Sequence, residues 1–285
     1  KRAFVALNGG QEMSPKEIHT VGSVSRIVGN SSEIMKAGHA ASLEEAFNNP
    51  QKNRKSEREF IEHERELFLH ITQELQELRK KYNQPSISVS PQNILLLDPK
   101  EITKLSDMAM AFYRQTEQRI FIPNEPQSLT RFSQILFHEL FHFYSYNASR
   151  VDKLFPDSET ISLANNYRVG MAIYPKGGSG DNEQTVKAFA FLNEAITEEM
   201  TKQFILKSKD HPFLGAEQSQ TEEIVSALKK LHPEMNTADI ACVSDSQDEI
   251  LQIDYFTYTN ERSFLNRLTD ILFEKNRDSF EGREA

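Results

Sequence analysis

The segment from Ser128 to Tyr146 constrains the fold of this chain more than any other. Apolar side chains occupy nearly every face of a helix drawn through it, and such a helix belongs in the centre of a domain rather than on its surface. The same segment also contains His138, Glu139 and His142. Because polar groups are costly to bury without partners, we expect this central helix to carry a functional site.

The spacing of these three residues indicates a metal site. Two histidines four positions apart lie one above the other on the same helix face, so His138 and His142 can reach one ion at about 2.0–2.1 Å, the usual zinc–nitrogen distance. Glu139 lies one step further along the helix, where it can reach a water molecule beside the ion. An acidified water and a carboxylate base are what metal-assisted hydrolysis needs. The pattern predicts one Zn²⁺ ion, with Glu139 as the catalytic base.

A catalytic zinc site usually has three protein ligands. No further histidine follows His142 at the spacing typical of metzincins, so the third ligand must come from another part of the chain. The best candidates are Glu194 and Glu198, which lie one turn apart on one face of a second predicted helix. The residues alone leave both Glu194 and Glu198 open as the third ligand, or Glu194 as an ordinary solvated residue.

The two motifs together resemble those of a known superfamily. His138-Glu-Leu-Phe-His142, followed by Asn193-Glu-Ala-Ile-Thr-Glu198, looks like the paired motifs of the gluzincin zinc peptidases, which include the thermolysin-like enzymes. The resemblance implies Glu194 as the third ligand, Glu198 as the carboxylate that orients a ligating histidine, and Asn193 as a substrate or structural contact. One departure is the separation of 52 positions between His142 and Glu194, which is longer than in thermolysin-like enzymes and suggests an inserted hairpin.

Two further features would complete a peptidase site. A Tyr or His after the third ligand stabilises the oxyanion in many gluzincins, and Tyr258 is the preferred candidate, with Tyr255, His211 and His232 as alternatives. The strand predicted at residues 119–123 directly precedes the central helix. In zincins such a strand often runs along the cleft, so we expect substrate to pair with it by strand addition.

The remaining patterns predict an α+β fold, because strands come first and helices later without regular alternation. We expect a zincin-like metallopeptidase domain over residues 54–285, with a small mixed sheet, a buried active-site helix and a mainly helical C-terminal part. Ser56 and Glu59 form a capping-box pattern at the start of a long amphipathic helix. The short apolar run at 93–98 predicts a buried strand, and residues 115–118 suit a hairpin turn between strands at 110–114 and 119–123. The other predicted elements are strands at 86–90, 167–175 and 255–259, a flexible loop at 176–182, and helices at about 185–208, 221–231 and 261–275.

Residues 1–53 are poor in large apolar side chains and rich in Ser, Gly and Asn. They predict an extended N-terminal arm or pro-segment rather than an independent domain. From its position we hypothesise that this arm lies across the cleft and inhibits the site.

Composition narrows the function classes. A net charge of −9 argues against nucleic-acid binding, and no apolar run approaches the 18 residues of a transmembrane helix. Cys242 is the only cysteine, which slightly favours a soluble cytoplasmic protein over an exported one, although the chain starts at Lys1 and the compartment stays open. The expected function is zinc-dependent hydrolysis of peptide bonds in peptides or proteins, the alternative being a catalytically silent zincin-fold regulatory or binding protein. The oligomeric state is not predicted.

Overall fold

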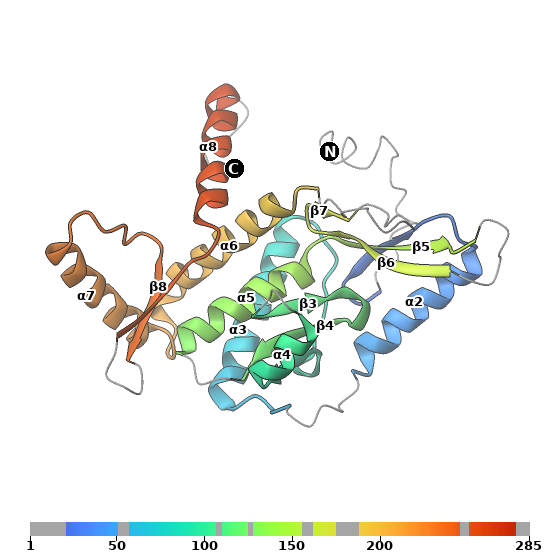
Figure 1. The fold of residues 1–285 in the computed structure, drawn as a ribbon, viewed down its shortest axis with the longest axis horizontal. Helices are drawn as coiled ribbons and strands as arrows, with labels where there is room; N and C mark the ends of the chain where they lie inside the picture. The colour runs from blue at the N-terminus through green and yellow to red at the C-terminus, as the bar shows by residue number, and fades with distance from the viewer. Residues whose placement is uncertain are drawn as a thin grey trace.

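The computed structural model describes residues 21–50, 57–106, 110–124, 128–155, 162–174, 188–245 and 251–277. Over these ranges seven α-helices combine with three small sheets, and α5 runs through the centre of the molecule (Figure 1). The elements are β1 Val24–Val28, α2 Glu33–Asn48, α3 Glu62–Lys81, β2 Ile94–Leu97, α4 Pro99–Leu105, β3 Phe112–Arg114, β4 Arg119–Pro123, α5 Leu129–Tyr144, β5 Asn147–Lys153, β6 Ser162–Val169, β7 Ala172–Ile173, α6 Ala190–Lys207, α7 Gly215–Leu231, β8 Ile240–Asp245, β9 Leu251–Tyr255 and α8 Thr259–Lys275.

A three-stranded sheet in the order β2-β4-β3 contributes buried side chains to the hydrophobic core. Side chains alternate across a strand, and both faces of this sheet are covered. Ile94 and Leu96 of β2 join the main core with α3 and α5, whereas Leu95 and Leu97 pack with Ile102 of α4 on the opposite face. The short apolar run predicted as a buried strand is therefore confirmed.

The hairpin predicted on either side of residues 115–118 is also confirmed, because β3 and β4 pair antiparallel. However, β4 is the central strand, with β2 parallel on one side and β3 on the other. The prediction that residues 119–123 pair with substrate is wrong for this reason: both edges of β4 are already hydrogen-bonded. The outer strand on that side of the sheet is β3.

Part of the segment expected to be an arm contributes to the second sheet, whose order is β1-β5-β6-β7. β1 pairs parallel with β5, and Leu43 of α2 packs against Val21 and Val24. Residues 24–48 thus form a strand and a helix beside the strand that follows α5. Residues 1–20 lie outside the described residues, and inhibition by this segment stays a prediction.

Several predicted boundaries differ from the structure. The helix expected from Ser56 begins at Glu62, with Ser56 itself outside the described residues; the Glu64 carboxylate accepts the Ile61 N–H at 3.1 Å at its N-terminus. The strand predicted at residues 255–259 is wrong, because β9 ends at Tyr255 and α8 begins at Thr259. Residues 86–90 belong to none of the three sheets. The predicted strand at 167–175 is divided between β6 and β7, while the loop predicted at 176–182 and the first residues of the helix predicted from 185 lie outside the described residues.

The N-terminus of α5 is held from two sides. The Ser128 hydroxyl accepts the Arg131 N–H at 3.0 Å. The Glu217 carboxylate, from the start of α7, accepts the N–H groups of Leu129 and Thr130 at 2.9 and 2.8 Å. A carboxylate at this end also interacts favourably with the helix dipole. The central helix is therefore fixed in position by an element almost ninety residues further along the chain.

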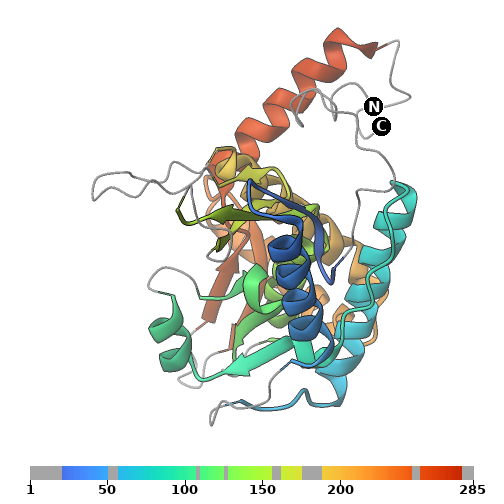
Figure 2. The same ribbon diagram turned by 90° about the vertical axis from the view of Figure 1, so that its right-hand side faces the viewer.

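The C-terminal part is mainly helical, with the β8–β9 hairpin between α7 and α8. α6 packs against α5, and its buried Phe204 and Ile205 join the main core. α8 extends away from the rest of the molecule in both views (Figures 1 and 2). No helix in the described ranges is both long and apolar enough to cross a membrane.

Candidate metal centre

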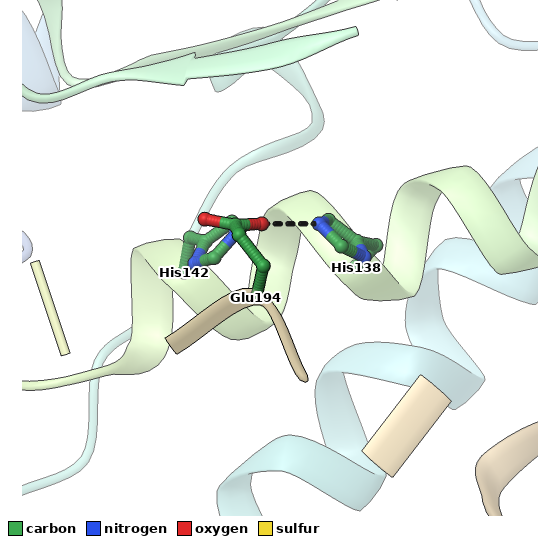
Figure 3. Close-up of side chains that lie close together, drawn as sticks. All are labelled: His138, His142 and Glu194. Atoms are coloured by element: carbon green, nitrogen blue, oxygen red, sulfur yellow. Dashed lines mark hydrogen bonds and ion pairs between the residues drawn. The ribbon is translucent and has the colours of Figure 1, made fainter. Parts of the chain in front are cut away.

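The packing of α6 against α5 brings three predicted ligands together. Glu194 points from α6 towards the two histidines of α5 (Figure 3). Its Oε2 lies 3.3 Å from Nε2 of His138 and 3.2 Å from Nε2 of His142. The ligand atoms of the three residues lie within 4.8 Å of one another, so the cluster can hold a metal ion.

The orientation of His138 is set by the other predicted carboxylate. Nδ1–H of His138 donates to Oε2 of Glu198 at 2.8 Å. This contact keeps one ring proton on Nδ1, so that Nε2, which faces Glu194, is the nitrogen that can exchange its proton for a metal ion. Glu198 therefore lies behind His138, on the opposite side from the ligand cluster, and the geometry favours Glu194 over Glu198 as the third ligand.

Glu198 is itself held by groups from two other segments. Its Oε1 accepts the Thr257 N–H at 2.7 Å and the Gln134 side-chain amide at 3.2 Å. The carboxylate is buried, with 2% of its side chain exposed. Three donors thus converge on one buried carboxylate, a satisfied arrangement that fixes its direction. Gln134 and Thr257 were not predicted from the sequence.

His142 has a corresponding support within α6. Its Nδ1 lies 3.5 Å from the Thr197 hydroxyl and 3.3 Å from the Asn193 side-chain amide. The Thr197 hydroxyl donates to the Asn193 carbonyl, so its oxygen can accept from Nδ1–H of His142, whereas the Asn193 amide can only donate to an unprotonated Nδ1. The two contacts hold the ring in place without fixing its tautomer. Asn193 Oδ1 in turn accepts the Met171 N–H at 2.9 Å, which ties the strand segment before α6 to the site. Thr197 had no predicted role, although it is part of the motif Asn193-Glu-Ala-Ile-Thr-Glu198.

The electrostatics of the cluster favour a cation. Burial lowers the pKa of His138, but the contacts with Glu194 and Glu198 outweigh this effect and raise it to about 10. Burial raises the pKa of Glu194, yet the two histidines hold it well below its usual range. A proton on the imidazole and a negative carboxylate therefore stabilise each other here. A divalent ion would replace that proton, as metal binding to histidine requires.

Glu139 lies beside this cluster, on the wall of a pocket of about 320 Å³ that is also lined by His138, Glu198 and Tyr258. Burial raises the pKa of Glu139, and the nearby Glu194 adds to this effect, whereas the two histidines oppose it. A carboxylate whose pKa is raised is a stronger base than an exposed one. The group predicted as the base therefore faces a space that can hold a small part of a substrate.

Tyr258 lies in the same pocket, at the turn between β9 and α8. Its ring is nearly parallel to that of His138, at an angle of 17° and a centroid distance of 6.2 Å. Burial, together with the surrounding carboxylates, raises its pKa to about 12, so the phenol keeps its proton and can donate it in a hydrogen bond. The alternatives lie elsewhere: the ring of His211 packs against that of His70 at a tilt of 31°, and His232 is the C-cap residue of α7. Tyr255 is at the end of β9 and outside the pocket lining.

A buried arginine holds the turn that bears Tyr258. Arg262, only 4% exposed at its side chain, donates from Nε to the Thr257 carbonyl at 3.0 Å. Its Nη2 pairs with Asp239 at 2.5 Å, and Asp239 also pairs with Lys202 of α6 at 3.2 Å. The turn is thus anchored to α6 and to the start of the β8–β9 hairpin. These contacts join segments distant in sequence, so spacing gave no signal for them.

In comparisons with known proteins, no family model, no curated protein and no solved structure matches this chain. The likeness to gluzincins therefore depends on the two motifs and on the way in which their residues meet.

Proposed function

We propose that this protein is a zinc-dependent peptidase of the gluzincin type. The observation that carries the proposal is the convergence of His138, His142 and Glu194. Glu139 lines a pocket together with His138, and Glu198 lies behind His138. Three protein ligands next to a carboxylate base and an accessible pocket are the features that separate a hydrolytic zinc site from a closed structural one.

The donor set fits zinc. Two imidazole nitrogens and one carboxylate oxygen are ligands that Zn²⁺ accepts, and both histidines present Nε2 to the cluster. Zinc, when bound, supplies Lewis-acid chemistry: it lowers the pKa of a water molecule and polarises a carbonyl group. Glu198 keeps the His138 ring in the tautomer that such binding needs, and Thr197 contacts the outer nitrogen of His142.

The other steps are assigned to residues around the pocket. The Glu139 carboxylate takes the proton of the attacking water and later gives it to the leaving amine. The Tyr258 phenol, protonated at neutral pH, donates a hydrogen bond to the oxygen on which negative charge develops. Both side chains line one pocket with His138, so they can act on the same substrate group.

The substrate is expected to be an extended peptide. Met110 and Ala111, which directly precede the outer strand β3, line the pocket together with Glu139. An extended chain can add to the outer edge of β3 through main-chain hydrogen bonds, which would bring its peptide groups past the base. This arrangement replaces the strand β4 as the expected partner of substrate.

The test compares the wild-type protein with Glu139→Gln. We expect the wild type to carry about one zinc per chain by elemental analysis and to cleave casein or fluorogenic peptides until a chelator is added. Glu139→Gln should keep the zinc and lose about 10²–10⁴-fold in turnover, because only the base is removed. Should both proteins bind zinc while the wild type cleaves no peptide, the enzyme proposal fails and a silent metal-binding protein is the better description.

A further inference from the structure

The pocket beside Glu139 contains one positively charged side chain in addition to the residues of the proposed mechanism. Arg131, in the first turn of α5, lines the pocket together with Gln134, His138 and Glu139. Residues at positions 131, 134, 138 and 142 follow one stripe of a helix, so Arg131 lies on the same face as the metal ligands. Its guanidinium is therefore part of the surface that a substrate would meet.

The charge of Arg131 is only loosely compensated. Nη1 donates to the Gln134 side-chain oxygen at 2.9 Å, and Nε lies 3.9 Å from Asp254, beyond hydrogen-bond length. In the described part of the chain this guanidinium makes no other hydrogen bond or ion pair. Its side chain is 19% exposed, so a further donor can be reached from the pocket. A planar guanidinium with unused donors suits a carboxylate in particular.

The distance along the helix excludes a role at the reacting bond. Arg131 precedes His138 by seven residues, or about 10 Å along the axis. An extended peptide covers about 10 Å in three residues. A group bound by Arg131 would therefore be about three residues away from the bond that is cleaved.

We propose that Arg131 forms a carboxylate-binding subsite, and that the preferred substrates are peptides with an acidic group about three residues from the scissile bond. This inference rests on the proposed peptidase function. The acidic group can be a Glu or Asp side chain or the C-terminal carboxylate of a short peptide, since both offer the same two oxygens. Gln134 supports the subsite, because its side-chain oxygen holds Nη1 and its amide contacts Glu198.

The test uses pairs of fluorogenic peptides that are identical except for Glu or Gln, with the residue placed in turn at each position from four before to four after the cleaved bond. A second pair carries either a free or an amidated C-terminus. For the wild type we expect kcat/KM to be about 10–100-fold higher for the acidic member at one position, the range of a charge-assisted contact. In Arg131→Gln this ratio should fall to about one, and in Arg131→Lys it should be partly kept.

Charge reversal gives the sharpest outcome: Arg131→Glu should prefer Lys to Glu at the same position. Arg267→Gln, a change of an exposed arginine on α8, is the matched control and should keep the wild-type ratio. Because each variant is judged by a ratio, a general loss of activity does not imitate the result. Equal ratios in the wild type and Arg131→Gln overturn the inference even if cleavage is normal.

Binding separates this inference from the peptidase proposal. The same peptide pairs are titrated against zinc-loaded Glu139→Gln, with and without Arg131→Gln, and followed by fluorescence anisotropy. Tighter binding of the acidic peptide that requires Arg131 supports the subsite, whether or not the wild type cleaves. Absence of any acidic preference in binding, even when peptides are cleaved, sinks the subsite and leaves the peptidase proposal standing.

Discussion

Replacing Glu198 by glutamine is the most informative change at this site. The buried carboxylate accepts hydrogen bonds from His138, Thr257 and Gln134 through its two oxygens. Glutamine offers one oxygen and adds an N–H₂ donor, so it cannot accept from both sides. If its oxygen faces Thr257, the His138 ring loses its acceptor; if it faces His138, two buried donors lose theirs.

The magnitude follows from these contacts. Loss of the partner that orients a ligating histidine typically lowers metal affinity by about 10–100-fold, or about 1.4–2.7 kcal/mol. A buried donor left without an acceptor costs about 1–3 kcal/mol of folding stability. We therefore expect Glu198→Gln to bind zinc about 10–100-fold more weakly than the wild type and to unfold at a lower urea concentration in its metal-free form.

The assay is a competition for zinc against a coloured chelator at fixed pH, with circular dichroism to verify folding. Glu199→Gln is the matched control, because Glu199 follows Glu198 on α6 but contacts Arg262 instead of the histidines. It removes the same charge one residue away. A zinc Kd for Glu198→Gln within twofold of that control would refute the view that Glu198 orients His138.

Two further predictions concern stability. Glu217→Gln weakens the carboxylate cap at the start of α5 and should cost about 1 kcal/mol in urea unfolding, whereas the exposed Glu222→Gln on the same helix should change little. Burial raises the pKa of Asp239, but Arg262 and Lys202 outweigh this effect and hold it below its usual range. A pKa depressed on folding adds stability that is complete above about pH 4 and is lost as pH falls through the folded pKa. Unfolding curves from pH 7 to pH 3 should therefore lose less stability in Asp239→Asn than in the wild type, and equal slopes would contradict the ion pair.

The sequence predicted those features that depend on local geometry. His138, Glu139 and His142 are placed by helical periodicity alone, and the same holds for the relation between Glu194 and Glu198. The central position of the α5 helix followed from its apolar faces, and the β3–β4 hairpin from two strand-like runs around a short turn. In each case the pattern that gave the prediction lies within one short stretch of sequence.

Features that depend on packing between distant elements could not be read in this way. The pattern at residues 119–123 indicated a strand, but only the sheet order shows that it is central and so unable to take a substrate. Similarly, Tyr258 was predicted within a strand and lies instead in a left-handed turn, with φ of 54°. Its place in the pocket depends on Thr257 and Arg262, whose partners are on α6 and near the β8–β9 hairpin.

Through these contacts Glu198 connects the candidate metal ligands with the turn that bears Tyr258. One of its oxygens orients His138, and the other holds the backbone of Thr257, the residue before Tyr258. The position of the proposed hydrogen-bond donor and the direction of the candidate ligand His138 are therefore fixed by the same buried carboxylate. Arg262 constrains the turn from the other side but touches neither histidine. Loss of Arg262 should consequently move Tyr258 without weakening metal binding, whereas loss of Glu198 should affect both. Comparing the two variants therefore distinguishes a defect in the position of Tyr258 from a defect in the metal ligands.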